Sequence, residues 1–145
     1  MKNESDVKEW IRCADMDVLS ANHLNEIQYP KPLEIICYHC QQAAEKMLKA
    51  LMLAYDGKLQ KTHDLGLLVD KRSAFIPFSE DILNAAAFLT PYGVKIRYPQ
   101  ELNIKEYHVS KALSNMKTLY DFVASKIKEL HTPISREESN AYKNA

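Results

Sequence analysis

The chain has 145 residues, a mass of 16.7 kDa and no net charge at pH 7, which is the size of one domain. Hydrophobic residues make up 46% of it and charged residues 26%, a usage that excludes an intrinsically disordered chain. Only three glycines are present. The chain therefore lacks the turn residues that an all-β fold needs every 8–12 positions or so, and helices are favoured.

The charge is unevenly spread along the chain. Residues 1–40 carry seven acidic and four basic side chains, whereas residues 41–100 carry eight basic and six acidic ones. A protein that binds a long nucleic acid through many phosphates usually has a stronger basic excess. The charge balance therefore argues against a duplex binder and leaves a short, local phosphate site open.

The cysteines and the N-terminus indicate a compartment. Three cysteines, an odd number, and an N-terminal sequence without a secretory signal favour reduced thiols in the cytoplasm over a disulfide framework. No apolar run approaches the roughly 20 residues that a membrane-spanning helix requires. We therefore expect a soluble, cytoplasmic protein without a membrane partner.

The first predicted helix begins at Ser5 or Asp6. Asp6 and Glu9 have the spacing of a capping box. The apolar residues that follow at helical intervals are Val7, Trp10, Ala14, Val18 and Ala21. The sequence Tyr-Pro-Lys-Pro at residues 29–32 then breaks the chain, because proline cannot occupy a helix interior without losing a hydrogen bond.

The second predicted helix, from Leu33 to about Tyr55, has the clearest pattern in the sequence. Its main apolar stripe consists of Ile36, Cys40, Ala43, Met47, Leu51 and Ala54. The residues that widen this stripe are Cys37, Ala44, Leu48 and Tyr55. Such a broad face can pack on two neighbours, and Gly57 is a natural helix stop.

Two shorter helices are predicted next. Thr62-His63-Asp64 supplies capping residues for a helix whose apolar residues are Leu65, Leu68 and Val69. Ser79 can cap a second short helix that contains Ile82, Leu83, Ala86 and Leu89. Thr90-Pro91 then predicts a kink or a restart, because proline is favoured at the first helical position.

The last helix completes the predicted fold. Asn103 and Glu106 again have capping-box spacing, and the core stripe that follows is Val109, Leu113, Met116, Tyr120, Val123 and Ile127. Short connections between the helices predict an all-α, up-and-down bundle of four to five helices. We expect residues 1–132 to form this single domain and residues 133–145 to form a polar, disordered tail.

Three segments of the chain resemble the HEPN family. Residues 38–51, YHCQQAAEKMLKAL, resemble the second-helix signature of that family. Residues 61–65, KTHDL, follow at the family's spacing, and residues 89–99, LTPYGVKIRYP, resemble a third family segment just before the last helix. The resemblance spans most of residues 5–130.

The resemblance implies a helical bundle that commonly forms a homodimer and is linked to nucleotides or RNA. It also implies a partner, often a small nucleotidyltransferase encoded nearby. The catalytic carboxylates and the glycine-serine motif of that enzyme do not occur in this sequence. We therefore do not expect the chain to transfer nucleotides by itself, and we expect no cofactor.

The family also contains metal-independent ribonucleases, which carry an arginine, a spacer of four to six residues and a histidine near the start of the last helix. In this sequence Arg97 is followed by its first histidine, His108, only after ten residues. In a ribonuclease, Arg97 would stabilise charge on the scissile phosphate and His108 would act as acid or base. The longer spacing argues against this role and favours His108 as an incidental histidine.

Candidate nucleotide contacts lie on the second helix and just after it. Polar residues three to four apart share one side of this helix, namely His39, Gln42, Lys46 and Lys49. They could contact a phosphate or a base, or form a solvated face opposite the core. His63 could stack on a base or bind a phosphate, or be a surface histidine beside a helix cap.

Arg97 is the strongest single candidate for a phosphate contact. Its planar guanidinium matches phosphate oxygens, and Tyr92 and Tyr98 flank it with rings suited to base stacking. The alternative is structural. Arg97 would then pair with Asp15 or Asp17, and both tyrosines would pack in the bundle.

Cys37 and Cys40 flank His39 and so suggest a metal or redox site. A zinc site needs four ligands, usually from two such pairs, and a redox pair normally belongs to a βαβ unit. The sequence supplies neither a second pair nor a predicted strand. We therefore predict no metal site and place Cys37 and Cys40 in the core as small apolar residues.

Three hypotheses for the function remain open. The first is a HEPN-like module without catalysis of its own, which binds a nucleotide or short RNA as a dimer and works with a partner. The second is a ribonuclease toxin that uses Arg97 and His108. The third is a purely structural module that docks another protein.

Overall fold

The computed structural model describes residues 3–72, 76–93 and 103–131, and every regular element in these ranges is a helix. The elements are α1 (Glu4–Ile27), α2 (Leu33–Asp56), α3 (Leu65–Arg72), α4 (Glu80–Leu89), the 3₁₀ turn η1 (Thr90–Gly93) and α5 (Glu106–His131). The predicted all-α bundle of four to five helices is therefore confirmed. Arg97, Tyr98 and the predicted tail over residues 133–145 lie outside the described residues.

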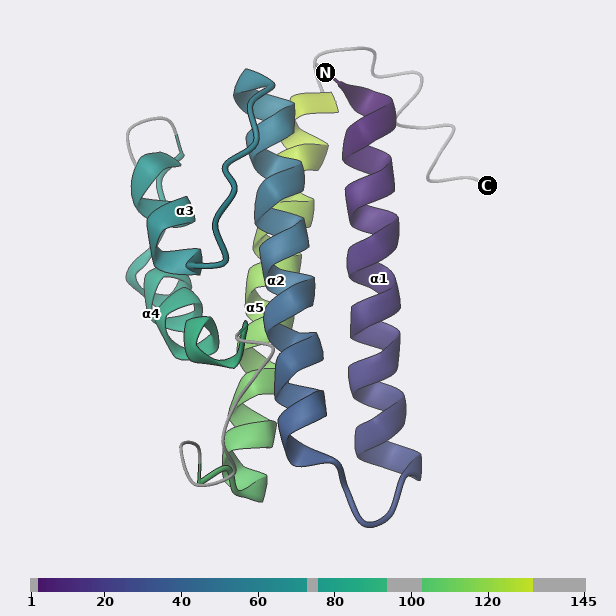
Figure 1. The fold of residues 1–145 in the computed structure, drawn as a ribbon. Coiled ribbons are helices and arrows are strands. Elements are labelled where there is room, and N and C mark those ends of the chain that lie inside the picture. Colours follow the sequence, from purple (N-terminus) through teal and green to yellow (C-terminus); the bar gives the residue numbers. More distant parts are fainter. Residues whose placement is uncertain (1–2, 73–75, 94–102, 132–145) are drawn as a thin grey trace.

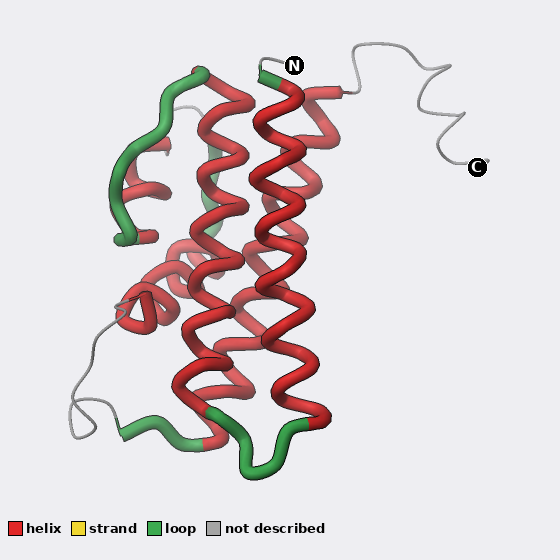
Figure 2. The backbone as a smooth tube through the Cα atoms, turned by 45° about the vertical axis from the view of Figure 1, so that its right-hand side comes forward, coloured by secondary structure: helices red, strands yellow, loops and turns green. Residues whose placement is uncertain are grey.

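The three long helices lie side by side, and α2 packs against both α1 and α5 (Figure 1). The chain runs along α1 and returns along α2. A segment without helix, residues 57–64, then runs back beside α2 to the start of α3 (Figures 1 and 2), and we call it the strap. The short helices α3 and α4 lie on the side of α2 away from α1, and α5 runs in the same direction as α2 (Figure 1).

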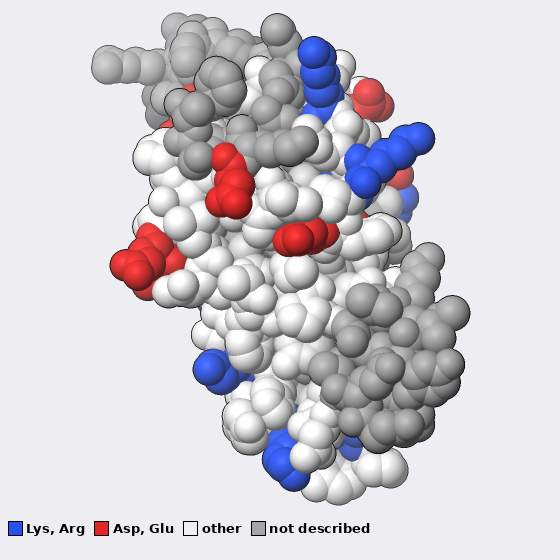
Figure 3. Space-filling view, turned by 60° about the vertical axis from the view of Figure 1, so that its left-hand side comes forward, with Lys and Arg blue, Asp and Glu red and all other residues white. Residues whose placement is uncertain are grey.

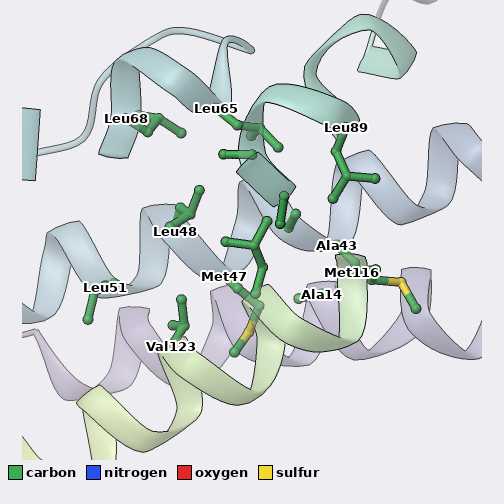
Figure 4. Close-up of a cluster of buried hydrophobic side chains, with 14 of the residues drawn as sticks. Ala14, Ala43, Met47, Leu48, Leu51, Leu65, Leu68, Leu89, Met116 and Val123 are labelled. Carbon is green, nitrogen blue, oxygen red and sulfur yellow. The ribbon is translucent and has the colours of Figure 1, made fainter. Parts of the chain in front are cut away.

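Helix α2 packs against every other element of the described bundle, because apolar residues cover most of its circumference. All six residues of its predicted main stripe are buried, and so are Cys37, Ala44 and Leu48. Figure 4 shows Met47, Leu48 and Leu51 among side chains from the neighbouring helices, which include Leu65, Leu68, Leu89, Met116 and Val123. The stripe predicted for the second helix is thus the core of the fold.

Three predicted helix ends are confirmed by their hydrogen bonds. Ser79 Oγ accepts the Ile82 N–H at 3.4 Å and caps α4. Gly57 has a φ of 73°, which favours glycine, and its N–H donates to the carbonyl of Leu53 at the end of α2. Asp64 Oδ1 accepts the N–H of Gly66 at 2.9 Å, so this aspartate caps α3.

The two predicted capping boxes are wrong. Helix α1 begins at Glu4, ahead of Asp6, and Glu9 accepts hydrogen bonds from Arg12 instead of capping. Helix α5 begins at Glu106 rather than after Asn103. In both places polar residues three apart reflect the polar surface of a helix or a loop, not a helix start.

Within the described residues, none of the helices combines the length and the apolar character needed to cross a membrane.

Candidate functional site

A line of polar side chains follows α2 between α1 and the strap, and we call it the polar seam. Its members are Asp17, His39, Gln41, Gln42, Glu45, Lys46, Lys49 and His63. Asp17, Gln41, Glu45 and Lys49 are buried. A charged side chain is stable away from water only when it is paired, and the seam provides these pairs in two groups.

The first group links α1 to α2 through Asp17. His39 Nδ1 lies 2.8 Å from one carboxylate oxygen of Asp17, and Lys46 Nζ lies 2.5 Å from the other. His39 and Lys46 are two helical turns apart and so face the same neighbour. Both oxygens of this buried carboxylate therefore have a partner, and both α2 side chains remain partly exposed.

The second group links α2 to the strap through Glu45. Lys49 Nζ lies 3.2 Å from one Glu45 oxygen, and His63 Nδ1 lies 2.8 Å from the other. The Gln41 amide donates to the same oxygen of Glu45 as His63 and to the backbone carbonyl of His63, each at 3.1 Å. Lys49 also lies 5.7 Å from the centre of the Trp10 ring, so the second group reaches α1 as well.

Gln41 also fixes the position of η1. Its side chain is fully buried, and its Oε1 accepts a hydrogen bond from Gln42 at 2.7 Å. Gly93 rests against this amide so closely that a Cβ at Gly93 would lie 2.6 Å from Gln41 Cδ. One glutamine side chain thus joins α2, the strap and the turn that follows α4.

His63 differs from the rest of the seam because its ring is at the surface. The side chain is 69% exposed, although Glu45 holds Nδ1 and Gln41 holds the backbone carbonyl. When a carboxylate accepts the proton on Nδ1, the other ring nitrogen, Nε2, is the one left for a ligand. The arrangement therefore presents an imidazole of fixed orientation to solvent.

The four candidates on the second helix share one side of α2, but this side is not a solvated face. Lys49 is buried, His39 and Lys46 are bonded to Asp17, and Gln42 donates to Gln41. The interpretation as a solvated face opposite the core is therefore wrong. The physical reason is that α1 and the strap cover this side and supply bonding partners for its polar groups.

The candidates from the third segment are described only in part. Tyr92 is buried, and its ring centre lies 5.7 Å from that of Phe88, so it packs in the bundle as the structural alternative predicts. Arg97 lies outside the described residues. Of its two predicted acidic partners, Asp17 holds His39 and Lys46, and Asp15 accepts the Tyr120 hydroxyl.

His108 stabilises the start of α5. It is the third residue of the helix, and its Nδ1 accepts the backbone N–H of Lys105 at 2.9 Å. This is the bond that a side chain at that position makes in a capping box, with an imidazole in place of a carboxylate. His108 thus has a structural role, and its catalytic role with Arg97 stays a prediction.

Gln41 and Glu45 are the members of the seam that the sequence analysis did not single out. Gln41, Glu45 and Lys49 are each four residues apart, a spacing at which helical side chains interact. Glu45 also stands within an apolar stretch, where an unpaired charge would be costly. These two signals together could have identified a buried polar group from the sequence.

The three cysteines differ in their surroundings. Cys37 and Cys40 are fully buried, as predicted for small core residues, whereas Cys13 is partly exposed. Burial raises the pKa of the Cys37 thiol to about 11 and raises the pKa of Cys40 further. In the part of the chain that the structure describes, no group of three or more His, Cys, Asp or Glu side chains is placed to hold a metal ion.

We expect one fast-reacting thiol in the native protein. The thiolate is the reactive form, so at neutral pH a thiol reagent should modify Cys13 quickly and leave Cys37 and Cys40 unmodified until the protein is denatured. The number of thiols modified per chain, with and without denaturant, measures this. A Cys13→Ser variant should lose the fast phase, and fast labelling that persists in this variant would contradict the expectation.

Comparisons with known proteins identify the family and agree with the fold. The family model of the HEPN domain matches residues 7–129. The archaeal HEPN homologue ST0689 is 22% identical, with 83% of this chain and 97% of that chain covered and a TM-score of 0.68. TT1696 from Thermus thermophilus is 26% identical over the same shares, with a TM-score of 0.69. No protein of curated function matches the sequence. The chain belongs to the HEPN domain family.

Proposed function

We propose that this HEPN domain binds a nucleotide or a short single-stranded RNA segment without cleaving it. We further propose that it acts as a homodimer, with a partner such as a small nucleotidyltransferase. The observation that carries the proposal is the exposed His63 ring held at Nδ1 by the buried carboxylate of Glu45. An imidazole with a fixed orientation at the surface is a suitable contact for a phosphate or a base.

The ring nitrogen that faces solvent sets the chemistry of this contact. With Nδ1 bonded to Glu45, Nε2 donates to a phosphate oxygen when the ring is protonated and accepts from a base edge when it is neutral. The fixed orientation also lowers the entropy lost on binding. His63 is therefore the primary contact in the proposed site.

The basic side chains contribute to the proposed site in different ways. Lys46 has three N–H donors and is partly exposed, so it can contact a phosphate while it keeps its bond to Asp17. Lys49 is buried and acts by holding Glu45. Arg97, which follows η1 closely in the sequence, is the proposed second phosphate contact.

The charge distribution favours a small ligand over a long duplex. The chain has no net charge. On the side of the molecule where α3 and α4 lie, the described Lys and Arg side chains are scattered rather than gathered into a patch (Figure 3). A binder of long nucleic acid would need many phosphate contacts on one surface.

Two observations support a site that binds without cleavage. Ten residues separate Arg97 from His108, and His108 Nδ1 is already bonded to the backbone at the start of α5. A catalytic histidine normally uses one nitrogen for the reacting proton and the other for a group that orients the ring. At His108 this second group is a backbone donor rather than an acceptor.

Binding can be tested with the purified chain, labelled single-stranded RNA, and adenine and guanine nucleotides, in the presence of a metal chelator. We expect binding without cleavage, and we expect His63→Ala and Arg97→Ala each to weaken it about tenfold or more, as for loss of a bond to a charged group. Lys117→Ala, on the exposed side of α5, is the control and should bind as the wild type does.

Two outcomes would contradict the proposal. Equal binding by His63→Ala and the wild type would remove His63 from the site. RNA cleavage that survives chelation and disappears in His108→Ala would replace the binding module with a ribonuclease.

A further inference from the structure

The exposed apolar residues of the bundle are concentrated in α1 and the segment that follows it. Eight large hydrophobic residues are exposed among the described residues, and five of them belong to α1 or to the connection and first turn that follow it. These five are Met16, Leu19, Ile27, Tyr29 and Ile35. Exposed apolar side chains that occur singly need no explanation, but a contiguous group marks an interaction surface.

The residues on α1 form one stripe opposite the core. Val7, Ala14 and Ala21 are buried, on the side of α1 that packs mainly against α2. The helical period of 3.6 residues places Met16, Leu19, His23 and Ile27 on the reverse side. Leu19 is 71% exposed. No described element covers this side of α1 in Figures 1 and 2. We call this stripe, together with the charged residues Arg12 and Glu26 near its two ends, the outer face of α1.

We propose that the outer face of α1 binds the same face of a second copy, with the two helices antiparallel and the two Leu19 side chains beside the twofold axis. The order of charges along the face favours a second copy of the chain in this orientation. Arg12 and Glu26 are each seven residues from Leu19. An antiparallel pair therefore brings Arg12 near Glu26 of the partner subunit, and by symmetry this contact occurs twice.

The opposite orientation lacks this complementarity. In a parallel pair each Arg12 faces Arg12 of the partner subunit, and each Glu26 faces Glu26 of the partner subunit. Like charges at an interface are unfavourable and select against that arrangement. The same antiparallel register places the apolar Met16 and Leu19 at the centre of the contact, where an interface excludes water best.

Arg12 already lies along this face in the single chain. Its guanidinium is bonded to Glu9 at 2.6 Å, and Nη1 lies 3.8 Å from the sulfur of Met16. The side chain therefore follows the helix surface instead of extending into solvent. Nε and Nη2 are bonded to Glu9, and Nη2 also lies 3.9 Å from the sulfur of Cys13. Nη1, beside Met16, is therefore the nitrogen with an N–H left for a carboxylate from a second copy.

This inference rests only on the dimeric state in the proposed function and not on nucleotide binding. The molar mass of the purified chain, measured by light scattering over a range of concentrations, should be that of a dimer. Leu19→Glu should be monomeric with an unchanged helical circular dichroism spectrum. The matched control is Leu67→Glu on α3, where the leucine is 48% exposed, and this variant should stay dimeric.

Charge exchange tests the orientation. Arg12→Glu and Glu26→Arg should each weaken dimerisation at least tenfold, and the double variant should restore it. Failure of the double variant to do so would overturn the antiparallel register. A dimer that Leu19→Glu leaves intact would overturn the face but leave the proposed function standing. A monomeric wild type would overturn both the face and the proposed dimer.

Discussion

Replacing Glu45 with alanine is expected to lower the free energy of unfolding by about 3–5 kcal/mol, the range found when one partner of a buried ion pair is removed. Glu45 is buried and holds Lys49 and His63 while it accepts from Gln41. Without the carboxylate, the ammonium group of Lys49 loses its ion-pair partner in a site from which water is largely excluded. Urea denaturation at neutral pH measures the loss.

Two further variants show whether the loss comes from the unpaired charge. Glu129→Ala removes an exposed carboxylate 3.5 Å from Lys126, and such surface pairs contribute only about 0–1 kcal/mol. The double variant Glu45→Met/Lys49→Met removes both charges and should recover much of the stability that Glu45→Ala loses. A Glu45→Ala protein as stable as Glu129→Ala would show that water reaches Lys49.

Gly93→Ala is expected to destabilise the protein by about 1–3 kcal/mol, the usual range for overpacking a filled site. The new methyl group would lie 2.6 Å from Cδ and 2.7 Å from Nε2 of Gln41. A flexible side chain at the surface would move aside, but Gln41 is fully buried and bonded to Glu45, Gln42 and the carbonyl of His63. Its displacement therefore strains or breaks several hydrogen bonds at once.

The position of the contact can be checked by combining substitutions. In a Gln41→Ala background the close contact is gone, so Gly93→Ala should then have little further effect on the unfolding midpoint, and the two changes should be strongly non-additive. Gly66→Ala is the control, because Gly66 is in a helix where alanine is favoured and its nearest neighbour would be the Asp64 carboxylate at 3.2 Å. Additive effects of Gly93→Ala and Gln41→Ala would contradict this account.

The helices and the core could be predicted from the sequence because both depend on local patterns. The helical spacing of the apolar residues from Ile36 to Ala54 predicts their stripe directly, and this stripe is the core of the bundle. The caps at Ser79 and Asp64 were predictable for the same reason, since a capping side chain bonds to a backbone N–H two or three residues away. The resemblance of three segments to the HEPN family identified the family of the chain correctly.

The candidate site could be predicted only in part, because its contacts join segments far apart in the sequence. The positions of His39 and Lys46 on one side of α2 follow from spacing, but their bonds to Asp17 depend on how α1 packs. The anchoring of His63 depends on the path of the strap. A polar stripe on a helix has the same sequence pattern whether water or another segment covers it, so the sequence leaves a solvated face open as an alternative.

The central position of α2 has a consequence for how the domain opens. Because α2 contacts every other described element, no part of the bundle can separate from it without exposing apolar residues of α2. The amide protons of α2 should therefore exchange with solvent only through global unfolding, whereas those of the strap can exchange through local opening. The bundle then behaves as a single cooperative unit, and a ligand that binds at the strap stabilises the whole domain.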